Sequence, residues 1–127
     1  MAPFNGIQVY EILENGNLLN GIYTNTKLLS NNDKDDSKDY HIDSEIAIKD
    51  LYDSKGVEGL YVCRYIESNN GLVTRCELKI SKYNGVYEFT WSNGNGQSWT
   101  GLGLMAGTTH IAVSYDEAYY SPAVRFL

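Results

Sequence analysis

The stretch from Tyr83 to Tyr115 reads YNGVYEFTWSNGNGQSWTGLGLMAGTTHIAVSY. In its first third, aromatic and polar side chains alternate, which places Tyr87, Phe89 and Trp91 on one face of a half-buried strand. The Asn-Gly pairs that follow tolerate the positive φ angles that tight hairpin turns require. We therefore predict three consecutive antiparallel strands in this stretch, joined by two glycine-containing turns.

The facing of the middle strand depends on the length of the loop at 93–96. A two-residue turn puts Thr100, Leu102 and Leu104, together with Ser98, on the face of Phe89, and a three-residue loop reverses this. We adopt the two-residue turn as the prediction, and the longer loop stays open as the alternative. Trp99, Gly101 and Gly103 would then face the other way. Glycines at alternate strand positions indicate the sharp bending that a small barrel needs to close, in preference to a ligand touching the backbone.

The rest of the chain supplies further strands. Alternation and turn signals predict strands at 6–13, 18–25, 40–49, 57–67 and 72–81, with Ile42, Ile46 and Ile48 in phase on one face of the third. Segments 28–38 and 50–56 are predicted as loops, the former solvated, and the strand pattern stops after Tyr115. With the strands at 86–91, 98–104 and 110–115, this gives about eight strands at short spacing. We predict an all-β fold, a single antiparallel up-and-down β-barrel domain over residues 1–127.

The two cysteines face each other across a predicted hairpin. If residues 68–71 form its loop, Cys63 lies opposite Cys76, and Tyr61, Cys63 and Tyr65 share the inner face. A disulfide and a pair of buried free thiols are both compatible with this placement. We favour free thiols, because disulfides are rare in cytosolic proteins and two cysteines are too few for a disulfide scaffold.

Composition and charge limit the classes of partner. The chain has 127 residues, 43% of them hydrophobic, and a net charge of −6. An acidic surface argues against nucleic acid and anionic membranes as partners. The first residues have neither a basic nor an apolar segment of the kind a signal peptide requires, and no apolar run is as long as a membrane span. We therefore expect a cytoplasmic protein.

The strands between Val86 and Tyr115 resemble the C-terminal hairpins of lipocalin-like and avidin-like barrels, the calycin type. The motifs are VYEFTW, WTGLGL and IAVSY, about a quarter of the chain. Leu19–Asn25 (LNGIYTN) is similar to the first avidin strand, with Tyr23 in place of a tryptophan and without the Gly-Ser turn after Asn25. The resemblance implies a barrel that holds small, often apolar, molecules; because of these departures we do not expect biotin.

The candidate site is the barrel lumen. An eight-stranded barrel is barely wide enough for its own side chains, so a filled interior and a ligand cavity are both open. Inward tyrosine hydroxyls need partners and thereby favour water or a polar ligand inside. The predicted ligand-binding residues are Tyr23, Asn25, Tyr61, Tyr65, Tyr87, Trp91 and His110.

Catalytic and metal-binding patterns are weak. Ser114, His110 and Asp116 could be written as a triad, but Ser114 lies within a strand and lacks the strained turn of a serine nucleophile. We predict no catalytic residues, no metal site and no cofactor. Our first hypothesis is a non-catalytic protein that binds a small, partly apolar ligand in the lumen. The alternatives are an interaction or homo-oligomer module and, least favoured, a lumen-based isomerase or hydrolase with His110 as base. The module would use exposed aromatics, namely Trp99, Tyr119, Tyr120 and Phe126.

Overall fold

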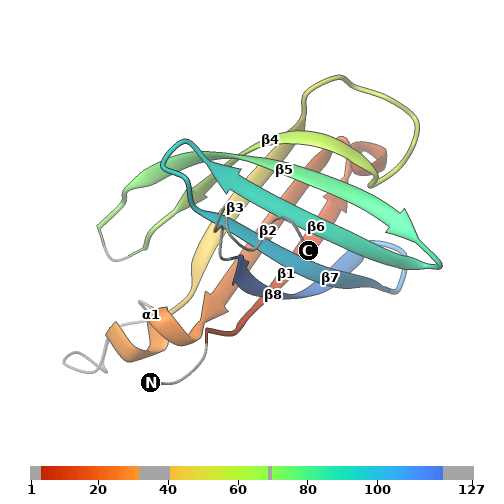
Figure 1. Cartoon of the computed structure of the whole chain (residues 1–127). Helices are drawn as coiled ribbons and strands as arrows, with labels where there is room; N and C mark the ends of the chain where they lie inside the picture. Colours follow the sequence, from red (N-terminus) through yellow and green to blue (C-terminus); the bar gives the residue numbers. More distant parts are fainter. Residues whose placement is uncertain (1–3, 32–40, 69, 119–127) are drawn as a thin grey trace, which may run out of the picture.

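The protein is a closed eight-stranded antiparallel barrel (Figure 1). The structure is a computed structural model that describes residues 4–31, 41–68 and 70–118. Each strand pairs with the next along the chain, and β8 pairs with β1 to close the barrel. This confirms the predicted up-and-down topology. The elements are β1 (Gly6–Leu13), η1 (Glu14–Gly16), β2 (Leu18–Asn25), α1 (Thr26–Asn31), β3 (Asp43–Lys49), β4 (Gly59–Ile66), β5 (Val73–Tyr83), β6 (Val86–Asn93), β7 (Ser98–Ala106) and β8 (His110–Ala118).

The predicted strands agree closely with the observed ones, and the differences lie at the ends of elements. β1 and β2 match their predicted bounds, whereas β8 continues three residues beyond Tyr115 to Ala118. The first part of the predicted loop at 28–38 is wrong, because α1 extends to Asn31. The side-chain oxygen of Asn25 accepts a hydrogen bond from the Leu28 backbone N–H at 2.9 Å and so caps this short helix. Residues 32–40 and 119–127 lie outside the described part of the chain.

The facing predicted for β7 is wrong, and the loop before it is the reason. The backbone N–H of Asn93 donates to the Gln97 carbonyl at 3.1 Å, which leaves Gly94, Asn95 and Gly96 as a three-residue loop. Gly96 has a φ of 81°, as expected for the left-handed residue that closes such loops. Trp99 is consequently paired with Trp91 on the inner face, and Leu102 and Leu104 point to the outside.

The glycines of β7 make room for ring side chains inside the barrel. Gly101 pairs with Phe89, and Gly103 lies on the same inner face. A Cβ atom at Gly103 would lie 2.7 Å from Cε1 of Phe89, and one at Gly101 would lie 2.8 Å from the Ser114 carbonyl oxygen. The absent side chains therefore allow the Phe89 ring and β8 to approach the β7 backbone.

The orientation of β3 puts charged side chains inside the barrel. Asp43, Glu45 and Lys49 are buried, with Ala47 between them on the same inner face. Ile46 and Ile48 point outward and are 38% and 49% exposed. The isoleucines are in phase, as predicted, but they are on the outer face. This orientation of β3 is what supplies polar groups to the interior.

One half of the interior is filled by packed side chains, and we call it the closed half. It contains the inward side chains near η1 and the β3–β4 loop. Asn17 joins the two, donating to the Asp53 carbonyl at 2.8 Å and accepting from the Asp53 backbone N–H at 2.8 Å. Lys49 Nζ lies 2.6 Å from Asp53 Oδ1 and 2.6 Å from the Gly56 carbonyl. The buried side chains of this half are Tyr10, Leu19, Ala47, Tyr61, Leu78, Ile80, Phe89 and Ile111.

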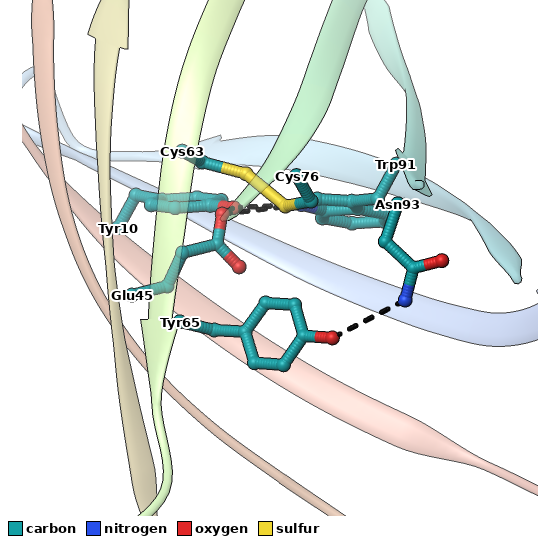
Figure 2. The surroundings of a disulfide bond; sticks show 7 residues. All are labelled: Tyr10, Glu45, Cys63, Tyr65, Cys76, Trp91 and Asn93. Atoms are coloured by element: carbon teal, nitrogen blue, oxygen red, sulfur yellow. Dashed lines mark hydrogen bonds between the residues drawn. A yellow bond between two sulfur atoms is a disulfide. The ribbon is translucent and has the colours of Figure 1, made fainter. Parts of the chain in front are cut away.

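Cys63 and Cys76 form a disulfide, so the prediction of free thiols is wrong (Figure 2). The predicted register is correct: the two residues are direct cross-strand neighbours on β4 and β5, with Cα atoms 5.2 Å apart. Direct pairing brings the sulfur atoms within bonding reach, and both side chains are buried.

Among the described residues, no helix is long and apolar enough to cross a membrane.

Candidate functional site

The other half of the interior, which we call the open half, contains a cavity of about 310 Å³. This half faces α1 and the β4–β5 and β6–β7 loops, as the order of the strand ends shows (Figure 1). The volume is at the lower end of the range for ligand pockets, about 300–1,000 Å³. The residues lining the cavity are Phe4, Gln8, Tyr23, Asn25, Lys27, Leu28, Asp43, Glu45, Tyr65, Glu67, Cys76, Trp91, Gln97, Trp99, Tyr115 and Glu117.

A buried carboxylate with two hydrogen-bond donors forms the floor of the cavity. Glu45 Oε2 accepts from the Tyr10 hydroxyl and, at 3.2 Å, from Trp91 Nε1. Figure 2 shows the other carboxylate oxygen directed away from Tyr10, on the side of Tyr65. Burial raises the pKa of Glu45, and the hydrogen bonds from Tyr10 and Trp91, together with the nearby Gln8 amide, offset part of that rise. Burial also raises the pKa of the Tyr10 hydroxyl, with the Glu45 charge acting in the same direction.

Gln8 brings an unpaired donor to the same floor. Its side chain extends inward from β1 and the residue is only 3% exposed. Its amide is near enough to Glu45 to favour the charged carboxylate. However, Nε2 itself is buried without a hydrogen-bond partner in the described part of the chain. A buried amide without a partner costs free energy, so Gln8 offers an unused donor at the floor of the cavity.

A second carboxylate, that of Asp43, lies two residues before Glu45 on the same face of β3. Asp43 Oδ1 accepts hydrogen bonds from the Ser68 backbone N–H at 2.9 Å and from the Ser68 hydroxyl at 2.8 Å. These bonds fix the carboxylate against the β4–β5 loop. Burial raises the pKa of Tyr23, and the charges of Asp43 and Glu45 raise it further. The two carboxylates therefore make the electrostatic potential in the cavity negative.

Asn25 and Tyr115 connect the cavity wall to the short helix α1. Asn25 Nδ2 donates to the Tyr115 hydroxyl at 3.1 Å, and the hydroxyl itself lies 3.3 Å from the Thr24 carbonyl. Burial raises the pKa of Tyr115 to about 12, and the hydrogen bond from Asn25 acts against that rise. The same Asn25 side chain caps α1, so the wall and the helix are positioned by a single residue.

Aromatic rings surround the carboxylates. Tyr65 and Trp99 meet edge to face with ring centroids 6.3 Å apart, and Tyr23 meets Tyr115 in the same way at 6.4 Å. Trp91 lies tilted against Tyr115 at 5.6 Å. The Tyr65 hydroxyl accepts a hydrogen bond from Asn93 Nδ2 at 3.4 Å (Figure 2). Ring faces and tyrosine hydroxyls therefore line a space that also contains carboxylate oxygens.

The structure brings part of the predicted set of ligand-binding residues to this cavity. Tyr23, Asn25, Tyr65 and Trp91 line it. The remaining members of the set, Tyr61, Tyr87 and His110, lie elsewhere.

Tyr61 is in the closed half, where its hydroxyl lies 2.6 Å from the carbonyls of Gly16 and Val57. Tyr87 is near the opposite end of β6 from the cavity, and its ring is 5.6 Å from Lys82 Nζ. His110 is exposed at the start of β8, with Nδ1 2.9 Å from the Thr109 hydroxyl oxygen. These residues lie apart from the cavity because β4, β6 and β8 all have their N-terminal ends in the closed half.

Sequence reasoning did not identify Gln8, Asp43, Glu45 or Trp99 as cavity residues. The alternation in Asp43–Lys49 contains a signal, since charged residues occupy one face and isoleucines the other. The general rule that apolar faces point inward assigns that face wrongly here. Trp99 was missed because the loop before β7 was predicted to have two residues and has three, which turns Trp99 inward.

The residues that could be written as a triad lie on the outside of the barrel. His110, Ser114 and Asp116 all lie on the exposed outer face of β8, away from the cavity. Within the described ranges, no group of His, Cys, Asp and Glu side chains could hold a metal ion.

Comparison of the chain with protein-family models, curated proteins and solved structures finds no match.

Proposed function

We propose that this protein is a calycin-type binding protein, of the lipocalin-like or avidin-like kind, which holds a small, partly apolar ligand in the open half of its barrel. The observation that carries this proposal is the unpaired donor of Gln8, which is buried at the floor of a cavity of about 310 Å³. Ring side chains supply the apolar contacts, and Asp43, Glu45 and Gln8 supply the polar ones. No step of chemistry is required of these residues.

The variant Gln8→Leu separates a role in binding from a role in folding. Removing a buried polar group that has no partner leaves the stability of the barrel unchanged or raises it. The same change removes a donor from the cavity, so ligand binding should weaken. The experiment is native mass spectrometry with indole, tryptamine and indole-3-acetate as probes, together with a urea unfolding curve. If Gln8→Leu destabilised the fold and left the binding of every probe unchanged, the proposal would fail.

A matched pair of tyrosine variants provides the control. Tyr65→Ala removes a ring from the cavity wall, whereas Tyr83→Ala removes a 68% exposed ring at the far end of β5. We expect the first variant to lose probe binding and the second to keep it. Equal binding by both variants would show that the probes bind outside the cavity.

A second candidate, self-association into a homo-oligomer, rests on the outer face of the barrel. Trp99, expected to be an exposed interaction residue, is half-buried and lines the cavity, while Tyr119, Tyr120 and Phe126 lie outside the described residues. An aliphatic outer face instead crosses β1 and its neighbours: Val9 pairs with Ile22 on β2 and with Ala112 on β8.

Leu102, Leu104, Ile7 and Ile46 continue this face and are exposed. The face itself is aliphatic, and charged side chains border it, since Glu88 pairs with Leu102 and Arg64 pairs with Ile46. Val9→Lys should abolish any dimer seen by light scattering. A wild-type chain that stays monomeric at high concentration would rule this candidate out.

A further inference from the structure

The cavity has an excess of negative charge close to its aromatic rings. Among the described residues that line it are four acidic side chains, Asp43, Glu45, Glu67 and Glu117, and one lysine, Lys27. Lys27 Nζ lies 3.3 Å from Glu117 Oε2 at the mouth. The carboxylates of Asp43 and Glu45 lie deeper, and the hydrogen bonds they receive come from neutral donors.

The hydrogen-bond donors to Glu45 are neutral, so neither of them supplies a positive charge. Tyr10 and Trp91 both donate to the same oxygen, Oε2, and the other oxygen is directed to the side of Tyr65, where a donor in the cavity can reach it. Lys49, the buried cation on β3, does not neutralise Glu45, because its ammonium group is 2.6 Å from Asp53 in the closed half. A charge in such a position is expected to have a partner of opposite charge.

The rings around these carboxylates also favour a cation. Trp91, Trp99 and Tyr65 line the cavity, and the face of a tryptophan or tyrosine ring attracts a cation within about 6 Å. A site that combines aromatic rings with carboxylates favours the binding of an organic ammonium group over that of a neutral or anionic group. The unpaired Nε2 of Gln8 further requires a hydrogen-bond acceptor or a π-face on the same molecule.

We infer that the ligand of this cavity is a small aromatic or partly apolar amine, whose ammonium group binds to Glu45 and Asp43 among the surrounding rings. This inference rests on the proposed lumen-binding function and adds the charge of the ligand to it. The cavity volume, about 310 Å³, is on the order of ten water molecules, which limits the ligand to a small molecule.

The test compares three probes that share one ring system and differ in charge: tryptamine, tryptophol and indole-3-acetate. Dissociation constants are measured by calorimetry at pH 8 for the wild-type protein. We expect tryptamine to bind at least about tenfold more tightly than tryptophol, because hydrogen bonds between charged groups are the stronger ones. Indole-3-acetate should bind most weakly.

Two variants locate the effect. Glu45→Gln keeps an acceptor for Tyr10 and Trp91 but removes the charge, so the preference for tryptamine over tryptophol should fall to less than about threefold. Glu88→Gln removes an equal charge from the outer face of β6 and should leave the preference unchanged. A preference that survives in Glu45→Gln, or disappears equally in Glu88→Gln, would overturn the assignment to this site.

The failure of this inference can be distinguished from the failure of lumen binding. If tryptophol or indole-3-acetate binds as tightly as tryptamine and is lost in Tyr65→Ala, lumen binding stands and the ammonium inference is wrong. If none of the three compounds binds, the ammonium inference is again wrong, and the retention of other molecules in native mass spectra then decides the proposed function.

Discussion

The closed and open halves of the barrel are built from the same eight strands with the same alternation, yet their interiors differ. In the closed half, hydrocarbon and ring side chains fill the space, and polar groups such as Tyr61 and Lys49 find partners in the loops. In the open half, Gln8 and the carboxylates of β3 surround a cavity. The strands are therefore held together by packing at one end of the barrel and enclose a cavity at the other.

The largest expected effect on stability lies in the closed half. Phe89 is 1% exposed and stacks on Tyr10 and Trp91 with centroid distances of 5.9 and 5.4 Å. Phe89→Ala should lower the free energy of unfolding by about 3–5 kcal/mol, since it removes a buried ring and leaves a void. Urea denaturation followed by circular dichroism measures this. Tyr65→Ala, in the open half, should cost clearly less, and an equal cost would contradict the division into halves.

The disulfide lies at the boundary between the halves, and Cys76 lines the cavity. The double variant Cys63→Ala/Cys76→Ala should lower the free energy of unfolding by about 3 kcal/mol, because the bridge closes a loop with a sequence separation of 13 residues. The measurement compares unfolding curves of the variant with those of the wild type before and after reduction. If the reduced wild type remained as stable as the oxidised protein, the bridge would have no stabilising role.

A smaller effect tests the packing of β7 against Phe89. Gly103→Ala forces a Cβ atom to within 2.7 Å of the Phe89 ring and should cost about 1–3 kcal/mol. Gly94→Ala, in the β6–β7 loop, meets no atom within 4 Å and is the control. We expect thermal unfolding to show a lowered midpoint for Gly103→Ala and an unchanged or slightly raised one for Gly94→Ala. The opposite order would refute the role assigned to Gly103.

The smallest effect depends on pH and concerns Glu45. Because the pKa of Glu45 is raised in the folded state, the wild type binds its proton more tightly when folded and loses stability as the pH rises from the ordinary glutamate range through the raised value. Glu45→Gln has no such loss. Its stability relative to the wild type should therefore increase with pH, by about 1.4 kcal/mol for each unit of the raised pKa.

The comparison needs both proteins, since other groups near the cavity also carry or gain charge. Those that face Glu45 are Tyr10 on β1, Tyr23 on β2, Asp43 on β3 and Tyr115 on β8. The three tyrosines stay protonated from pH 4 to pH 8, because burial raises their pKa above the ordinary value, so their ionisation does not enter the difference. A difference in the free energy of unfolding that stays constant from pH 4 to pH 8 would show that Glu45 titrates normally.

The sequence predicted the parts of the fold that depend on local signals. The hairpin of β4 and β5 has a short loop, and its register, including the pairing of Cys63 with Cys76, follows from counting outward from that loop. The same counting failed after Asn93, where two Asn-Gly pairs allow loops of different length. One residue of difference turned Trp99 inward and moved Leu102 to the outside.

The site was less predictable than the fold because it depends on β3. No short loop ties β3 to a neighbour, since residues 26–42 precede it and residues 50–58 follow it. Its facing therefore rested on the polarity of its side chains, and here the isoleucines are outside. Only the pairing of Glu45 with Tyr65 reveals that Asp43 and Glu45 share the interior with the tyrosines of β4.

The meander order of the strands has a consequence for how fast the protein folds. Most seams of the barrel join neighbours in the chain, but the β8–β1 seam joins Gly6 to Tyr115 across almost the whole sequence. Contacts of such separation form slowly, because a long stretch of chain must be ordered first. We expect the open sheet to assemble before this seam closes. Until then the edges of β1 and β8 are unpaired, and this is the interval in which the chain is most prone to aggregate.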